Sequence, residues 1–232
     1  MSLPGAIALS VGDMRFDLHV HTRWSPDSVT GLTQIIRHVA HKGLDGLAIT
    51  DHNTIAGALA LREAAPFPVI VGEEIATSEG EIIGLFLHRT VPRGLSPEET
   101  IAAIREQQGV VYIPHPLDRL RREAMGRRVL ERIIDRVDAL EVFNARNLIP
   151  QDNALARQIA AAHGLAMGAG SDAHLPYEIG RAFVEIEPFD SPASFLAALH
   201  RGRIEGVVTT PLIHVLTSVT KALLRVSGRL LE

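Results

Sequence analysis

The chain has 232 residues, of which 46% are hydrophobic and 22% are charged, with no cysteine and a formal net charge of -4. This composition excludes a disordered chain, a disulfide scaffold and a cysteine nucleophile, and the charge gives no general attraction to nucleic acid or anionic membranes. The length fits one large domain or two small ones, and any metal must be bound by His, Asp or Glu, which favours hydrolytic or Lewis-acid chemistry over redox chemistry.

Strands and helices are predicted to alternate along the chain. Hydrophobic periodicity indicates their cores, while glycine, proline and capping residues indicate their ends, as in the capping box that begins at Ser96. In the first half, strands are predicted at 15–20, 46–50, 68–72, 81–87 and 110–113, and helices at about 32–41, 54–65 and 97–108. In the second half, an Arg-rich helix at about 122–136 precedes a strand at 139–143, a helix at 153–163, strands at 165–170, 182–186 and 206–208, and an amphipathic helix at about 213–231. A further helix begins after Ser191.

This alternation, without a break in composition, predicts one parallel β/α domain over residues 1–232. In β/α barrels, functional groups gather at the carboxyl ends of the strands. His52, Glu74, His115 and Asp172 each follow a predicted strand, and strand geometry puts His19 and His21 on one face. These side chains are therefore expected to share one site, and imidazoles with carboxylates are typical ligands for zinc and related metals.

Five motifs carry these residues in the order Asp17-Leu-His-Val-His-Thr22, Thr50-Asp-His-Asn53, Gly72-Glu-Glu-Ile75, Pro114-His-Pro116 and Gly170-Ser-Asp-Ala-His174. With them the chain resembles the polymerase and histidinol phosphatase (PHP) family of metal-dependent phosphoesterases. The resemblance implies an α/β fold, a distorted seven-stranded (β/α)7 TIM-like barrel, with two or three divalent ions of zinc, manganese or iron.

The resemblance also implies which residues bind each metal. The first metal would be held by His19, His21, Glu74 and Asp172, with Glu74 bridging to the second and Glu73 as the weaker candidate for that bridge. The second would be completed by His115, while Glu81 stands where the family usually has a histidine and His88 is an alternative donor. The third would be bound by Asp27, His52 and His174.

For catalysis, two neighbouring metals would activate a bridging water and neutralise phosphoryl oxygens during in-line attack, so the expected nucleophile is a metal-bound hydroxide. His52 or His174 could protonate the leaving oxygen, and Asp51 would orient an imidazole. Arg119, Arg146 and Arg181 are candidates for binding the phosphate, with Asn144 beside them, although a surface ion pair is the favoured explanation for each arginine.

The expected function is hydrolysis of a phosphate monoester or diester of a small metabolite or nucleotide. One alternative is a 3'-5' or 5'-3' exonuclease on single strands, with an oligonucleotide as partner. Another is a metal-stabilised binding module without activity, which Glu81 favours. The Arg-rich segment has enough acidic residues to be a solvated helix face. Because residues 1–11 lack a basic region and are too short to span a bilayer, we expect a cytoplasmic protein without a membrane partner, of undetermined oligomeric state.

Overall fold

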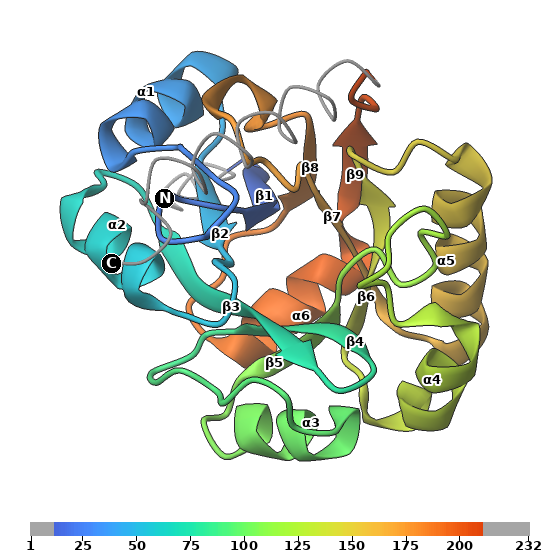
Figure 1. Cartoon of the computed structure of the whole chain (residues 1–232). Helices are drawn as coiled ribbons and strands as arrows, with labels where there is room; N and C mark the ends of the chain where they lie inside the picture. The colour runs from blue at the N-terminus through green and yellow to red at the C-terminus, as the bar shows by residue number, and fades with distance from the viewer. Residues whose placement is uncertain (1–11, 211–232) are drawn as a thin grey trace, which may run out of the picture.

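A computed structural model describes residues 12–210, so the predicted helix at 213–231 lies outside the described residues. Figure 1 shows a central sheet with helices packed around it. The strands are β1 Met14–Val20, β2 Gly46–Ile49, β3 Val69–Thr77, β4 Gly80–Leu85, β5 Val110–Ile113, β6 Ala139–Asn144, β7 Ala166–Gly170, β8 Ala182–Ile186 and β9 Arg203–Gly206. The helices are α1 Leu32–Lys42, α2 Ala56–Ala64, α3 Pro97–Arg105, α4 Gly126–Ile133, α5 Pro150–His163 and α6 Pro192–Arg201, with short 3-10 turns at Ile134–Arg136 and Pro176–Glu178.

Within the described residues, nine strands form one sheet in the order β7-β6-β5-β4-β3-β2-β1-β8-β9. β1, β2 and β3 are parallel, as are β5, β6 and β7, and β4 joins the two sets by antiparallel pairing with β3 and β5. The segment after β7 returns to β1, because Val20 pairs with Ala173 and the backbone N–H of Asp172 donates to the carbonyl of His19 at 2.8 Å. The result is a nearly closed mixed α/β barrel, which confirms the predicted fold class. The expectation of a parallel sheet was wrong in part, because β4 pairs antiparallel with β3 and β5, and β8 pairs antiparallel with β1 and β9.

β1 contributes to two hydrophobic clusters. Phe16 and Leu18 pack in a cluster that includes Tyr112, whereas Val20 packs in a second cluster with Ile35 of α1. The pairing of β1 with β2 shifts register between Asp17 and Val20, which is where the strand passes from one cluster to the other. All of these apolar side chains are fully buried, so the strand that carries the histidine pair is anchored on both sides.

The capping box predicted at the start of α3 is present. Ser96 Oγ accepts a hydrogen bond from Glu99 N at 3.2 Å, and Glu99 Oε2 accepts one from Ser96 N at 2.8 Å. Most other predicted elements also appear, with their ends shifted by a few residues. No helix in the described stretch 12–210 is long and apolar enough to cross a membrane.

Three sequence predictions need correction. The Arg-rich helix begins at Gly126 rather than at residue 122, because residues 114–125 form a loop and Gly126 has a φ of 74°. The last strand is β9 at Arg203–Gly206 rather than at 206–208, because its partner residues in β8 lie opposite that segment. Glu74 lies inside β3 rather than after a strand, because β3 leaves β2 after Val71 and continues as the antiparallel partner of β4.

Candidate metal centre

The barrel brings together all nine side chains predicted as metal ligands. β1 and the loop after it supply His19, His21 and Asp27, and the turn after β2 supplies His52. The antiparallel pair contributes Glu74 from β3 and Glu81 from β4, and the segments after β5 and β7 contribute the remaining three, His115, Asp172 and His174. Eight of the nine are buried and His52 is partly exposed. Residues separated by more than 150 positions in sequence therefore face one another inside the protein.

The tightest group surrounds the Nε2 atoms of His19 and His21, which are 3.1 Å apart. Asp172 Oδ1 lies 3.6 Å from the first and 3.4 Å from the second, and Glu74 Oε2 lies 3.3 Å from both. Donor atoms bound tetrahedrally to zinc at about 2.0–2.1 Å are separated by roughly 3.3 Å. These spacings are thus those of ligands around a single cation.

Glu74 lies between this group and a second one. Its Oε2 faces His19 and His21, whereas its Oε1 lies 2.9 Å from His115 Nε2. Glu81 faces the same region, with one oxygen 3.6 Å from His52 Nδ1 and the other 3.8 Å from His115 Nε2. Glu74 therefore turns each of its two oxygens to a different group of candidate ligands, which is the arrangement that a carboxylate needs to bridge two cations.

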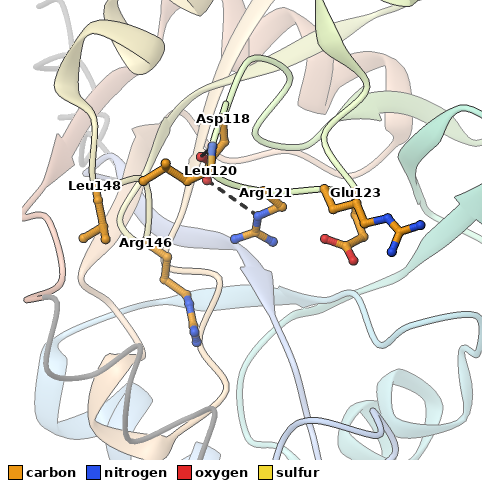
Figure 2. Close-up of a pocket in the computed structure, with 7 residues that line it drawn as sticks. Asp118, Leu120, Arg121, Glu123, Arg146 and Leu148 are labelled. Atoms are coloured by element: carbon orange, nitrogen blue, oxygen red, sulfur yellow. Dashed lines mark hydrogen bonds and ion pairs between the residues drawn. The ribbon is translucent and has the colours of Figure 1, made fainter.

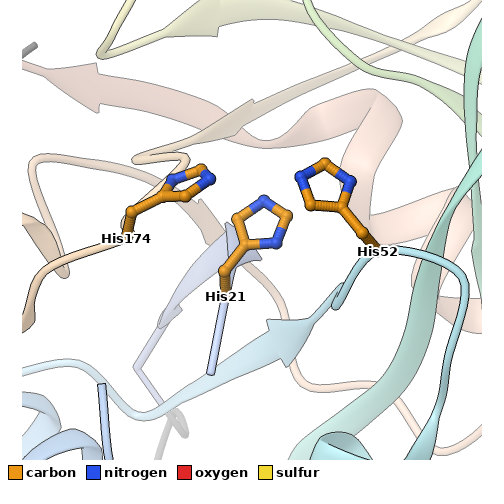
Figure 3. A group of neighbouring side chains, drawn as sticks. All are labelled: His21, His52 and His174. Carbon is orange, nitrogen blue, oxygen red and sulfur yellow. The ribbon is translucent and has the colours of Figure 1, made fainter. Parts of the chain in front are cut away.

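A third group lies near the opening of the site. Asp27 Oδ2 is 3.5 Å from His52 Nε2 and 3.4 Å from His174 Nε2. Figure 3 shows the imidazoles of His21, His52 and His174 side by side, and the ring of His21 is 4.6 Å from that of His52 and 4.3 Å from that of His174. His52 directs one nitrogen to this group and the other to Glu74 and Glu81, so it joins two parts of the site.

Neighbouring acceptors orient three of the imidazoles. His19 Nδ1 lies 3.1 Å from Glu141 Oε1, and His174 Nδ1 lies 2.8 Å from the carbonyl oxygen of Asp172. His21 Nδ1 lies 3.1 Å from Ser25 Oγ, which itself donates to Asp51 Oδ1 at 2.9 Å. A proton on each Nδ1 satisfies these contacts and leaves the Nε2 lone pair free to bind a metal. Asp51 thus acts on His21 through Ser25 rather than directly.

The charges in the site are unbalanced without a cation. Burial lowers the pKa of the His21 imidazole, but Asp172 and Glu74 outweigh it and raise that pKa to about 9. Burial also opposes ionisation of Glu74 and Asp172. Even so, His19 and His52 hold the pKa of Glu74 well below its usual range. Arg121 and His19 do the same to the pKa of Asp172. Burial and the negative charge of Glu74 raise the pKa of Glu81 to about 8. Protons on the histidines therefore supply charge that a divalent cation would otherwise supply.

The residues fit a divalent metal. Asp172 Oδ1 and His115 Nδ1 are buried and have no hydrogen-bond partner among residues 12–210, and Asp172 Oδ1 faces the histidine pair. Asp172 and His115 also have positive φ angles of 53° and 28°, which are unusual for residues other than glycine and mark a backbone held in place by its surroundings. The donors are nitrogen and oxygen only, which suits zinc, manganese or iron.

A cavity of about 340 Å³ is lined by residues of two loops, the one after β5 and the one after β6. Figure 2 shows Arg121 and Arg146 among its lining residues, with Leu120 and Leu148. Arg121 forms an ion pair with Asp172. The cavity thus adjoins the group of candidate metal ligands.

The residues predicted to bind substrate lie in different places. Arg146 lines the cavity, and its Nη1 lies 3.4 Å from Glu178 Oε1. Arg119 does not line it, because its guanidinium extends over α5 to Asp152. Arg181 is partly buried and is also absent from the lining. Asn144 donates to Glu141 Oε2 at 2.8 Å and to Asp172 Oδ2 at 3.4 Å, so it supports the carboxylates.

Sequence reasoning assigned no role to Glu141, Ser25 or Arg121. Glu141 was visible as a lone carboxylate in an otherwise apolar predicted strand, and that was its one signal. Arg121 belonged to a run of arginines in which nothing distinguished it from its neighbours. Of the alternative donors, His88 is exposed, and Glu73 instead accepts a hydrogen bond from Val91 N.

Comparison with known proteins agrees with this geometry. The family model described as PHP domain matches residues 17–113, and one described as PHP-associated matches residues 150–204. Protein MJ1587 of Methanocaldococcus jannaschii is 44% identical over 145 residues, which are 57% of this chain and 82% of that protein. A 5'-3' exoribonuclease of Haemophilus influenzae is 34% identical over 104 residues, 41% of this chain and 37% of the exoribonuclease.

A solved structure shares the fold. It is a two-domain protein from Bacteroides vulgatus containing a predicted PHP-like metal-dependent phosphoesterase, and it matches with a TM-score of 0.67 at 18% identity. The match covers 84% of this chain and 65% of that protein, so the chain spans less than two thirds of its length. The family matches include four of the five motifs that carry the candidate ligands. The chain belongs to the PHP domain family.

Proposed function

We propose that this protein is a metal-dependent hydrolase that cleaves a phosphate ester of a small metabolite or nucleotide. The observation that carries the proposal is the convergence of five imidazoles and four carboxylates with spacings of about one coordination shell. Divalent cations held there would lower the pKa of a water molecule and neutralise the charge of phosphoryl oxygens. The chain's own residues would bind the cations, orient the reacting groups and shield them from bulk water.

His52 is the better placed of the two histidines for giving a proton to the leaving oxygen. Its side chain is 16% exposed, and although burial lowers its pKa, Glu74 and Asp27 raise it above the ordinary histidine value. Burial instead lowers the pKa of His174 to about 4, so that imidazole is neutral at pH 7. His174 therefore acts as an acceptor or ligand, while His52 holds a proton at Nε2, near Asp27, only in the state in which no cation is bound at that position.

The test is hydrolysis of p-nitrophenyl phosphate and of its bis-ester, with manganese and with zinc. We expect turnover that a chelator removes, and we expect His19→Ala to lower kcat/KM by more than about 1,000-fold, as for loss of a group needed throughout catalysis. His88→Ala changes an exposed histidine outside the site and should leave the rate unchanged. Turnover that persists in chelator or in His19→Ala would contradict the proposal. If turnover depends on the metal and on His19, a panel of nucleotides, phosphorylated sugars and histidinol phosphate would identify the substrate.

A second candidate function is a 5'-3' exonuclease, which the similarity to the Haemophilus influenzae exoribonuclease favours. That similarity covers 37% of the exoribonuclease, so its activity comes to this chain as a proposal alone. A length ladder from single-stranded RNA labelled at its 3' end would support the exonuclease. Arg127 and Arg128 are exposed on α4, and reversing both charges should weaken oligonucleotide binding and its salt dependence.

Metal binding without cleavage of any ester would instead favour the third candidate, a metal-stabilised binding module without activity.

A further inference from the structure

Two of the arginines in the loop between β5 and α4 bind carboxylates of different segments. Arg119 donates from Nε and Nη2 to Asp152 Oδ1 at 2.9 and 2.5 Å, and its backbone N–H donates to Asp152 Oδ2 at 3.2 Å. Asp152 is buried in the first turn of α5, so this contact fixes the loop to the helix. Backbone hydrogen bonds from Arg121 N to Asp118 O and from Gly126 N to Pro116 O hold the loop's turns.

Arg121, two residues further on, extends to the metal ligands. Its Nη2 donates to Asp172 Oδ2, its Nε lies 3.7 Å from Asp118 Oδ2, and its side chain is 18% exposed. The other oxygen of Asp172 faces His19 and His21. Arg121 therefore contacts the side of Asp172 that is turned away from the histidines, and a cation held by Oδ1 does not require the arginine to leave.

The guanidinium of Arg121 has donors to spare. Asp172 takes up Nη2 and Asp118 is near Nε, while Nη1 makes no hydrogen bond to any part of the chain that the structure describes. Arg121 also lines the 340 Å³ cavity, as shown in Figure 2. An arginine held by carboxylates on one edge presents its other N–H groups in a fixed direction, which suits a phosphoryl group better than a mobile side chain would.

Arg146 reaches the same cavity from the loop after β6. Its backbone N–H donates to Asn144 Oδ1 at 2.8 Å, its guanidinium lies 3.4 Å from Glu178, and the residue is 8% exposed. Glu178 is fully buried and accepts hydrogen bonds from the backbone N–H groups of His174 and Leu175. Arg121 is thus held by a carboxylate of the segment 172–175 and Arg146 by a carboxylate that supports this segment, and both arginines line the cavity.

We propose that Arg121 and Arg146 form an anion subsite that binds the phosphoryl group of the substrate beside the metal centre. This inference rests on the proposed function and adds the residues that recognise the substrate. Leu120, which is 66% exposed, and Leu148 line the same cavity and offer apolar surface to the rest of the ester.

The experiment measures binding of inorganic phosphate to the full chain by titration calorimetry in saturating manganese, with metal content determined in parallel. We expect Arg121→Gln and Arg146→Gln to keep the wild-type manganese content and to raise the Kd for phosphate at least tenfold, with Arg121→Lys in between. Arg157→Gln removes an exposed arginine of α5 outside the cavity and is the matched control, which should bind phosphate like wild type. With an aryl phosphate, Arg121→Gln should raise KM more than it lowers kcat.

Three results would overturn the subsite. They are absence of phosphate binding by the wild-type protein, a Kd in Arg121→Gln within twofold of wild type, and loss of manganese from Arg121→Gln, since the arginine would then act through Asp172 alone. Phosphate binding needs no turnover, so failure of the proposed function would appear separately, as a wild-type protein that binds phosphate through Arg121 but cleaves no ester.

Discussion

Single carboxylates behind the imidazoles determine how the candidate ligands are oriented. Glu141 accepts from His19 Nδ1 at 3.1 Å, from the backbone N–H of His115 at 2.8 Å and from Asn144 at 2.8 Å. It thereby fixes one histidine by its ring and another by its backbone. A buried group with three such contacts sets ligand geometry without binding the metal itself.

Replacing Glu141 by Gln should therefore weaken metal binding. The amide has only one oxygen, so its NH2 group replaces either Oε1, the acceptor for His19 Nδ1, or Oε2, the acceptor for the backbone N–H of His115 and for Asn144. In either case one of the two histidines loses the contact that orients it. We expect the affinity for manganese to fall about 10- to 100-fold. Titration of chelator-treated protein measures this, and Glu63→Gln, on the exposed face of α2, is the control. An unchanged affinity would mean that Glu141 does not orient His19.

Glu73 gives a prediction about stability and pH. It is fully buried, its Oε2 accepts from Val91 N at 2.9 Å, and burial raises its pKa to about 7. Because the folded-state pKa lies above the unfolded value, the stability that depends on the neutral carboxyl is complete below about pH 4.5 and is lost as pH rises through 7. The rise in the pKa from 4.5 to about 7 corresponds to a loss of roughly 3 kcal/mol.

Glu73→Gln should remove this dependence. Thermal unfolding in chelator at pH 5 and pH 8 compares the variant with wild type at each pH. We expect the variant to gain stability relative to wild type between pH 5 and pH 8, because only the wild-type side chain must ionise there. If the difference between the two proteins is the same at both pH values, Glu73 does not titrate in this range.

At the scale of elements, helix α2 packs directly on the polar network behind the candidate metal ligands. Gly57 lies in its first turn, where a Cβ would collide with Asp51 Oδ2 and Thr22 Oγ1. Thr22 donates to both oxygens of Asp51 at 2.6 Å, and Asp51 holds Ser25, which contacts His21. The absence of a side chain at Gly57 thus lets the helix approach the residues that orient His21.

Gly57→Ala should disturb both packing and metal binding. The added methyl group must displace the helix or Asp51, which we expect to lower the free energy of unfolding by about 1–3 kcal/mol. Manganese affinity should fall as well. Gly31→Ala, just before α1, adds a methyl group 3.5 Å from its nearest neighbour and is the control. Denaturant unfolding measures the free energy of unfolding of both variants, and metal titration measures their manganese affinity. If both quantities are the same for Gly57→Ala and wild type, the close packing of α2 on Asp51 does not matter for either.

Elements with strong local signals were predictable, and those set by distant contacts were not. β5 and β8 appear within their predicted bounds because apolar runs flanked by turn residues determine them locally. The loop at 114–125 was predicted in part as helix because its arginines and glutamates have helical spacing. Its conformation depends on Asp152 and Asp172, which are about 30 and 50 residues away in sequence, and no local pattern reports such partners.

At the scale of the whole molecule, the barrel explains why the site could be predicted at all. Parallel strands deliver their carboxyl ends to one edge, so the polar residues that follow β2, β5 and β7 were expected to meet. Glu74 and Glu81 reach the same place from within the antiparallel pair β3 and β4, which this rule does not predict. The same rule says nothing about which nitrogen of His52 faces which carboxylate, or whether an arginine reaches Asp172. Those features depend on side-chain packing among several loops, which the sequence does not display.

The assembled charge also predicts proton release on metal binding. Asp172 and Glu74 raise the pKa of His21 to about 9 against the effect of burial, so His21 carries a proton at pH 7 until a cation replaces it. Manganese affinity should therefore rise between pH 6 and pH 9. Without metal, the stability from protonated His21 is complete below about pH 6.5 and is lost as pH rises through 9. Calorimetry in buffers of different ionisation enthalpy measures the number of protons released when manganese binds. Equal manganese affinity at pH 6 and pH 9 would contradict the prediction that the cation displaces a proton from His21.

The proposed function requires the convergent histidines and carboxylates to bind divalent metal. Crystals soaked in manganese and measured at its absorption edge test it most directly, through the anomalous difference map. We predict a strong peak within about 2.0–2.3 Å of His19 Nε2, His21 Nε2, Glu74 and Asp172 Oδ1, and a second between Glu74 and His115. A map with no peak among these side chains at saturating manganese would contradict the account.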